Sequence, residues 1–302
     1  KAADHRGGAV MDKKQWNERI KLVEEALVKE LGKDKALVPE LAASMEYSLT
    51  AGGKRLRPIL LMAAADAVGA KGTDFIQAAC GIEMIHTYSL IHDDLPAMDN
   101  DDYRRGKLTN HKVYGEAMAI LAGDALLTQA FEVILRQPNV PAELLLQVVK
   151  EMSIAAGPNG MVGGQVIDML SEGKRISMKE LRKMHMGKTG ALFRAAIRSG
   201  AIMARADEKQ LEALTTYADC FGLAFQITDD ILDVVGDEAV IGKPVGSDER
   251  NDKSTYVTLT SLEEARRLAA DTVAQAVEAL EVFGDKASFL KELVEMLLER
   301  NK

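Results

Sequence analysis

Residues 77–92 of the chain read QAACGIEMIHTYSLIH and end directly before a pair of aspartates, Asp93 and Asp94. This segment is apolar on most faces of a helix, which is typical of a helix that other helices surround. Two further segments, 117–135 and 213–235, share the pattern. We therefore expect three central helices, with the amphipathic segments at both ends of the chain forming an outer layer.

Helical periodicity extends over nearly all of the remaining chain, and strand-like alternation is almost absent. Trp16, Ile20 and Val23 recur at three- and four-residue spacing, and apolar residues do the same over 268–280. Gly- and Pro-containing breakers separate the helical stretches, but no Ser- or Gly-rich linker divides the chain. The sequence predicts an all-α fold, a single large helical bundle over residues 11–302, and residues 1–10 are interpreted as a cloning remnant.

The composition excludes several classes of protein. With 38 Lys+Arg against 46 Asp+Glu the net charge is −8, which argues against a nucleic-acid partner. Cys80 and Cys220 lie in apolar helical stretches and are expected to be buried thiols in a reducing compartment. No apolar run approaches the roughly 18 residues of a membrane span, because the run at 59–65 stops at Asp66. No apolar stretch typical of a signal peptide follows the first basic residues, so we expect a cytoplasmic protein without a membrane span.

Two acidic segments are hard to explain as packing. The first, residues 92–102, reads HDDLPAMDNDD, and the second, residues 229–233, reads DDILD. Each follows an apolar helix, so its carboxylates emerge from the end or wall of a buried element, where charge is costly unless it has a partner. A solvated acidic turn or a helix cap is the alternative for either segment alone. Two such segments together favour a shared partner.

The spacing of the aspartates indicates what that partner is. Asp229 and Asp233 are four residues apart and lie on one helical face. Asp93 and Asp99 are six apart, but Pro96 predicts a break or bulge that could bring Asp99 back alongside Asp93. Carboxylates without imidazole or thiolate suit a hard divalent cation, Mg²⁺ or Mn²⁺, bound jointly with a phosphorylated substrate.

Basic residues complement these acids. They stand in GGKRLRP at 52–58, in Arg104-Arg105 after the first acidic segment, in GKTG at 187–190, and as Lys243 and Lys253 in a Gly-rich stretch. Arginine offers a planar fork and lysine a point charge for a diphosphate group. GKTG is not a nucleotide-binding P-loop, because Arg182 stands where the first glycine would be and no strand precedes it. A lone Glu83-x-x-His86 is too little for a di-iron bundle, which needs two copies.

In these motifs the sequence resembles the trans-isoprenyl diphosphate synthases, and within that family the bacterial farnesyl type. The resemblance covers residues 11–302 and is carried by GGKRLRP at 52–58, HTYSLIHDDLPAMDNDDYRRG at 86–106, GKTGALF at 187–193, QITDDILDV at 226–234, GKPVGSD at 242–248 and KSTY at 253–256. It implies a helical bundle whose central helices surround an active-site cavity, and a homodimer.

The resemblance also implies roles for individual residues. The two acidic segments would hold two or three Mg²⁺ ions on the diphosphate of an allylic substrate, with Asp93, Asp94, Asp99, Asp229 and Asp233 as metal ligands and Asp230 completing the second motif. The same diphosphate would be bound by Arg104, Lys188, Thr189, Gln226 and Lys243, and Lys253 is a further expected substrate-binding residue. Arg104 and Lys188 join the aspartates in the expected catalytic set. The diphosphate of isopentenyl diphosphate would be bound by Lys54, Arg57, His86 and Arg105, with Arg300-Asn301-Lys302 nearby. Gln165 and Asp168 would line the cavity without a fixed role.

The implied activity is the condensation of geranyl or dimethylallyl diphosphate with isopentenyl diphosphate to give farnesyl diphosphate. Tyr88 and Ser89 lie five and four residues before Asp93, which on a helix is roughly 6–8 Å deeper. A bulky Tyr88 would therefore floor the cavity and stop chain growth, and ordinary core packing of this ring is compatible with that role. For His86, a buried core histidine is the alternative.

Four other functions remain as alternatives. A geranylgeranyl diphosphate synthase of the same family differs only in product length. A terpene cyclase would share one acidic helix but has no need of a second acidic motif or of GGKRLRP. A non-catalytic partner subunit is disfavoured because both acidic motifs are intact. A plain helical scaffold leaves the ordered basic motifs unexplained.

Overall fold

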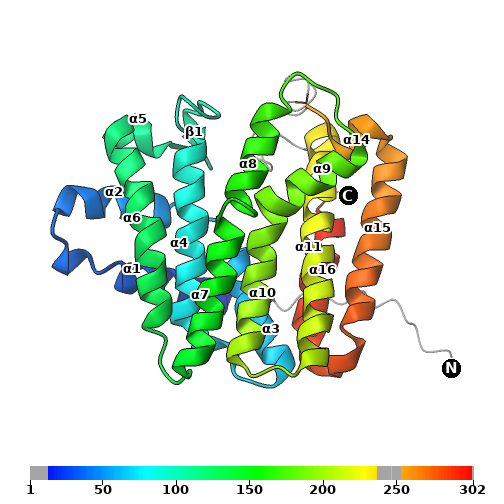
Figure 1. Ribbon diagram of the computed structural model, residues 1–302, viewed down its shortest axis with the longest axis horizontal. Helices are drawn as coiled ribbons and strands as arrows, with labels where there is room; N and C mark the ends of the chain where they lie inside the picture. Colours follow the sequence, from blue (N-terminus) through cyan, green and yellow to red (C-terminus); the bar gives the residue numbers. More distant parts are fainter. Residues whose placement is uncertain (1–12, 237–245, 247–252, 301–302) are drawn as a thin grey trace.

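Helices make up nearly all the regular structure in the computed structural model, which describes residues 13–236, 246 and 253–300 (Figure 1). In chain order they are α1 (Lys13–Leu31), α2 (Pro39–Leu49), α3 (Leu56–Val68), α4 (Ile76–Asp93), α5 (Asn110–Tyr114), α6 (Glu116–Leu135), α7 (Ala142–Ala156), α8 (Met161–Leu170), α9 (Met178–His185), α10 (Ala191–Met203), α11 (Glu208–Val235), α14 (Tyr256–Leu259), α15 (Leu262–Ala279) and α16 (Ser288–Glu299). The all-α prediction is confirmed. Residues 1–10, interpreted as a cloning remnant, lie outside the described residues.

Short turns complete the described chain. Three are 3-10 turns, η1 (Lys33–Lys35), η2 (Gly72–Phe75) and η4 (Glu281–Ala287), and η3 (Met186–Gly190) is a π-helical turn. Strands β1 (Tyr103–Arg104) and β2 (Lys107–Leu108) pair antiparallel, with Tyr103 opposite Leu108. This hairpin follows α4 at one end of the bundle (Figure 1).

Two of the three expected central helices lie in the interior. Of the 18 residues of α4, 12 are buried, and the helix packs against both α6 and α3. Helix α11 packs against α10 and α15 along its length (Figure 1). Each of these two buried helices carries an acidic segment at or near its C-terminal end, so the core itself fixes where the carboxylates stand.

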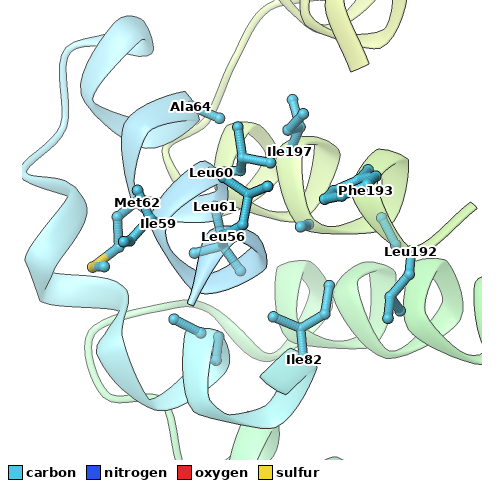
Figure 2. Packing of buried hydrophobic residues seen from close by; sticks show 14 of the residues in the cluster. Leu56, Ile59, Leu60, Leu61, Met62, Ala64, Ile82, Leu192, Phe193 and Ile197 are labelled. Carbon is cyan, nitrogen blue, oxygen red and sulfur yellow. The ribbon is translucent and has the colours of Figure 1, made fainter. Parts of the chain in front are cut away.

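The most completely buried pair is α3 and α10, in each of which ten of 13 residues are buried. Their backbones approach closely because Gly200 has no side chain; a Cβ there would lie 2.0 Å from the Leu61 carbonyl oxygen. Figure 2 shows Leu60 and Leu61 of α3 beside Ile197 of α10, with Ile82 of α4 across from them. The sequence pattern did not single out this pair, because both helices are short.

Helix α6 differs from the expectation of a surrounded central helix. Only seven of its 20 residues are buried, and Ile120, Leu121 and Leu135 are 44%, 56% and 53% exposed. By length and composition alone α6 is apolar enough to cross a membrane, so the expectation that no such run exists is wrong. Core helices of water-soluble proteins pass the same test, and one face of α6 does pack along α4. On its exposed side, Ile120, Leu121 and Leu135 stand among the charged Asp124 and Glu132.

Candidate active site

A cavity of about 1490 Å³ brings together segments far apart in sequence. The predicted site residues that line it are Lys54, Arg57, His86, Arg104, Arg105, Asp168, Lys188, Thr189, Gln226, Asp229, Asp230, Lys253 and Arg300. The predicted residues Asp93, Asp94, Asp99, Asp233, Gln165, Tyr88 and Ser89 are described but are not part of the lining. Lys243, Asn301 and Lys302 lie outside the described residues. Acidic, basic and amide side chains therefore share one hollow.

The first acidic segment folds back on itself directly after α4. The helix ends at Asp93, three residues before Pro96, as the sequence predicts. The backbone N–H of Asp99 donates a hydrogen bond to the carbonyl of Asp93 at 2.9 Å. Asn100 adopts the left-handed region with φ 54°, a conformation that asparagine tolerates better than most residues. This tight turn brings the backbones of positions 93 and 99 together, although the two residues are six apart in sequence.

Asp94, the middle carboxylate of this segment, is engaged by the protein itself. Arg104 donates from Nε and Nη2 to both carboxylate oxygens of Asp94, at 2.9 and 2.8 Å. Burial alone would lower the pKa of Arg104, but the hydrogen bonds and charge of Asp94 raise it. A two-point contact of this kind fixes the plane of the guanidinium as well as its position. Asp94 therefore orients Arg104 at the edge of the cavity.

Asp93 carries the clearest electrostatic perturbation in the segment. Its pKa is raised to about 6 chiefly by burial, with the charges of Asp99 and Asp94 adding to the rise. The positive charges of Lys188 and Arg104 oppose this shift. A carboxyl group whose charge is disfavoured in this way gains when a cation arrives, because the cation restores a partner to the buried charge.

The second acidic segment lies within an unbroken helix. Helix α11 continues to Val235, so Asp229 and Asp233 are one turn apart on the same face, as predicted. Asp230 accepts a hydrogen bond from Gln226 Nε2 at 3.0 Å and another from the backbone N–H of Tyr256 at 2.9 Å. It ties α11 to the start of α14. In each acidic segment, then, the second aspartate is bound by protein groups.

The acidic residues fit a divalent cation that is shared with a substrate. Within residues 13–236, 246 and 253–300, no three His, Cys, Asp or Glu side chains are close enough together to hold a metal ion by themselves. Mg²⁺ is usually bound by one or two carboxylates together with water and substrate phosphates rather than by an all-protein cage. Carboxylates at the end of α4 and on α11, of which Asp229 lines a cavity with many basic groups, match that preference.

The basic motif at 52–58 lines the cavity, and one of its arginines is held there by protein groups. Arg55 is only 3% exposed and donates to Glu83 Oε1 at 3.2 Å and to the Leu49 carbonyl at 2.7 Å. This contact accounts for Glu83, which lines the same cavity. Lys54 and Arg57 also line the cavity, so Arg55 anchors the motif beside them.

The second glycine of this motif makes room for the hairpin. Gly53 has φ 116°, and a Cβ there would lie 2.5 Å from Nη1 of Arg105. Arg105 itself sits in the left-handed region at φ 51°, followed by Gly106 at φ 76°, a two-residue turn of the kind that connects tight hairpins. Its side chain donates to the carbonyl of Gly52. Segments about 50 residues apart thus meet at the cavity rim.

Arg57 and His86 form a buried pair on the same wall. The Arg57 guanidinium lies 4.4 Å from the centre of the Phe193 ring, and its Nη1 is 3.4 Å from Nε2 of His86. Burial and the neighbouring arginines hold the pKa of His86 well below its usual range, so the imidazole is neutral at pH 7. A neutral Nε2 can accept from Arg57, which leaves the other guanidinium nitrogens available to an anion.

The π-helical turn η3 places Lys188 and Thr189 at the opposite wall. Such single-turn widenings shift side chains relative to a regular helix and are common at functional sites. The turn lies directly against α8: a Cβ on Gly164 would be 2.1 Å from the backbone nitrogen of Lys188. One turn further along α8, Asp168 accepts a hydrogen bond from Lys188 Nζ at 2.6 Å.

Tyr88 and Ser89 are buried on α4, behind the cavity wall. The Tyr88 ring packs edge-on against His92 with the ring centres 5.4 Å apart, and burial raises the pKa of its hydroxyl. Ser89 donates to the carbonyl of His86 at 2.6 Å. Neither lines the cavity, and the proposed role of Tyr88 as a floor stays a prediction.

Sequence reasoning missed two aromatic supports of the basic residues. Phe193 lies under Arg57, and Phe225 lies 4.8 Å from the guanidinium carbon of Arg300. Arg300 also donates to the Phe225 carbonyl at 2.8 Å and to Thr228 Oγ1 at 2.6 Å. Stacking of arginine on a ring leaves no signal in sequence spacing when the partners are far apart in the chain.

Known proteins resemble this chain in sequence and in fold. The polyprenyl synthetase family profile matches residues 38–296. A farnesyl diphosphate synthase of Micrococcus luteus is 49% identical over 94% of this chain and 96% of its own, and a geranylgeranyl diphosphate synthase of Cyanophora paradoxa is 46% identical over 94% and 95%. The crystal structure of an FPP/GFPP synthase from Zymomonas mobilis superposes with a TM-score of 0.85 at 35% identity, covering 95% of this chain and 98% of that one. The chain belongs to the polyprenyl synthetase family.

Proposed function

We propose that the protein condenses an allylic diphosphate, geranyl or dimethylallyl diphosphate, with isopentenyl diphosphate to form farnesyl diphosphate. The observation that carries this proposal is the single cavity that Asp229, Lys188, Arg57 and His86 all line. Two diphosphate-bearing substrates could be held side by side there. The names of the Micrococcus and other relatives support farnesyl diphosphate as the product.

The residues divide between the two substrates. Lys188, Thr189, Gln226 and Arg104 are the groups for the allylic diphosphate, and Lys54, Arg57, His86 and Arg105 are the groups for isopentenyl diphosphate. Mg²⁺, or Mn²⁺ in its place, would be held by Asp93, Asp99, Asp229 and Asp233 and would stabilise negative charge on the allylic diphosphate. Asp94 would contribute by holding Arg104, given its two-point contact with that side chain.

The reaction breaks the allylic C–O bond and forms a C–C bond. As that C–O bond breaks, negative charge develops on the departing diphosphate, and preorganised Lys188 and Arg104 stabilise it without having to reorganise. Arg57 and Lys54 hold the diphosphate group of isopentenyl diphosphate. Its double bond then attacks the allylic C1 in an effectively unimolecular step. A proton then leaves the new cation, and the released diphosphate takes it, so no side-chain base is required.

A geranylgeranyl diphosphate synthase is the second candidate. It is favoured by the Cyanophora relative of that name at 46% identity. The two candidates share every charged group above and differ only in how far the chain can grow into the apolar interior.

The deciding experiment incubates the protein with Mg²⁺, isopentenyl diphosphate and geranyl diphosphate and sizes the dephosphorylated products by chromatography. We expect a C15 alcohol that disappears with EDTA and in Asp93→Ala. A C20 product would favour the second candidate. Binding of both substrates without any condensation would contradict the catalytic proposal and favour a non-catalytic partner subunit.

We further propose a homodimer that covers the outer face of α6. Only 39% of the most apolar window of this helix is buried, and Ile120 and Leu121 face outward on it. Exposed large apolar side chains next to one another often mark an interface between protein chains. Sedimentation would test it: Leu121→Glu should give monomers, and an unchanged sedimentation rate would contradict the proposed interface. A cytoplasmic location, expected from the sequence, also stays a prediction.

A further inference from the structure

Asp168 holds two ammonium groups from different parts of the chain. Lys188 Nζ donates to Asp168 Oδ2 at 2.6 Å, and Lys253 Nζ lies 3.8 Å from the same oxygen. The carboxylate side chain is 13% exposed, against 29% for that of Lys188 and 32% for that of Lys253. All three residues line the cavity.

The backbone is built to bring these groups together. Gly164 lies four residues before Asp168, on the same face of α8, and its missing side chain allows η3 to pack against α8. The contact at Gly164 is with the backbone of Lys188 itself. The glycine therefore fixes the distance between the two elements, and Asp168 fixes the direction in which the lysine side chain extends.

The other charged groups near Lys188 do not provide the hydrogen bond that Asp168 makes to it. The charges that act on Lys188 are those of Asp168, Asp99 and Asp93, and those that act on Asp168 are Lys188, Lys253 and His185. A hydrogen bond to Lys188 is contributed by Asp168, whereas Asp99 and Asp93 act on it through charge. Without the Asp168 carboxylate, two partly buried ammonium groups would face each other across a short gap.

We infer that Asp168 is a positioning residue, which holds Lys188 and Lys253 at the allylic-diphosphate end of the cavity before the substrate arrives. The inference rests on the proposed function in taking these lysines as diphosphate ligands. An ammonium group has three donors. Lys188 can therefore keep its bond to Asp168 and still donate to a phosphate oxygen, so the anion meets cations that are already in place.

Asp168→Asn keeps the size of the side chain and removes its charge. We expect the KM for geranyl diphosphate to rise about 10-fold, as for other changes that leave a partly buried charge unpaired, while the KM for isopentenyl diphosphate stays unchanged. Asp168→Glu should recover part of the loss. Asp219→Asn is the matched control, because Asp219 lies on α11, pairs with Arg194 at 3.8 Å and is outside this cavity. Its kinetics should be those of the unchanged protein.

A double-mutant cycle separates positioning from a general structural role. If Asp168 acts through Lys188, adding Asp168→Asn to Lys188→Met should raise the KM for geranyl diphosphate by less than about 3-fold, because the effects of interacting residues are not additive. An equal loss in both backgrounds would overturn the inference, and so would equal rises in the KM of both substrates.

Calorimetric binding of inorganic diphosphate tests the same point without catalysis. The Asp168→Asn protein should bind this anion about 10-fold more weakly than the unchanged protein. Unchanged or tighter binding would mean that Asp168 merely competes with the anion for the lysines, and would overturn the inference. Because this measurement needs no turnover, it remains decisive even if the unchanged protein forms no prenyl product, an outcome that would count against the proposed function alone.

Discussion

The two acidic segments border one cavity but are built differently. The first stands where α4 ends, and a turn, a hairpin and Arg104 hold it in shape. The second lies inside α11, where helical periodicity alone aligns Asp229 with Asp233. A helix end can be reshaped by its surroundings, whereas a continuous helix cannot. The first segment therefore depends on partners elsewhere in the chain, and its Asp93 shows the perturbed pKa.

The largest effect should come from removing a charge that would hold metal in either segment. Asp93→Asn and Asp229→Asn should each lower kcat by about 10³-fold, because charge on the departing diphosphate would lose its main stabilisation. Steady-state kinetics at saturating Mg²⁺ measures this. Asp271→Asn, which removes an exposed partner of Arg267 on α15, serves as the control. If only one of the two variants were impaired, the segments would not act as a pair.

The next effect concerns the contacts that hold the middle aspartates. Arg104→Lys replaces a two-point contact on Asp94 by a one-point contact, and should raise the KM for the allylic substrate about 10-fold. Gln226→Ala removes one hydrogen bond to Asp230, but Asp230 still accepts the hydrogen bond from the backbone N–H of Tyr256. Its cost in unfolding free energy should be only about 1 kcal/mol. Urea unfolding of both variants compares the segments directly, and equal losses of unfolding free energy would contradict the stronger dependence of the first segment on its partners.

A smaller effect follows from pH. Burial raises the pKa of Asp93 to about 6, so its carboxylate becomes protonated as the pH falls through 6, and Mg²⁺ binding and kcat/KM should fall with it. Without metal the sign for stability is the opposite. The folded-state pKa lies above the ordinary value of 3.8, so the ionised group destabilises the fold at pH 7.5, and this penalty disappears as the pH falls through 6 toward 4.

Asp93→Asn removes that penalty at pH 7.5. In EDTA the variant should therefore be more stable than the unchanged protein by about 1–3 kcal/mol in urea unfolding. A loss of stability would show that Asp93 has a partner in the folded protein even when no metal is bound.

The smallest effect on rate, but a clear one on the product, should come from the helix of the first segment. Tyr88 stands five residues before Asp93 on α4, whereas α11 has Ala224 five residues and Phe225 four residues before Asp229. Tyr88→Ala should lengthen the products beyond C15, with kcat changed less than about threefold because no charged group is lost. Product chromatography gives the answer, and unchanged C15 output would remove Tyr88 from this role.

The sequence was most informative where the cause was local. The break after Asp93 was predictable because Pro96 acts within a few residues, and the alignment of Asp229 with Asp233 follows from the pitch of one helix. The all-α bundle was equally predictable from repeated apolar spacing.

What the sequence could not reveal depends on distant partners. That Arg55 is tied to a carboxylate depends on Glu83, 28 residues away. The contact of Asp168 with Lys188 requires α8 and η3 to meet at Gly164, and no spacing in the sequence encodes this. The exposure of Ile120 and Leu121 on α6 was not predictable either, because an apolar composition does not reveal which side of a helix its neighbours cover.

The packing of Arg105 against Gly53 has a consequence for recombination between related proteins. A side chain at position 53 would displace this guanidinium and would be strained by the φ of 116°, so the loop before α3 and the β1–β2 hairpin depend on each other. A chimera that takes one of these two segments from a relative with a larger residue at position 53, and keeps the other from this chain, should lose the rim of the cavity although every charged residue is present. Recombination between relatives would therefore preserve the site only when both segments are exchanged as one block.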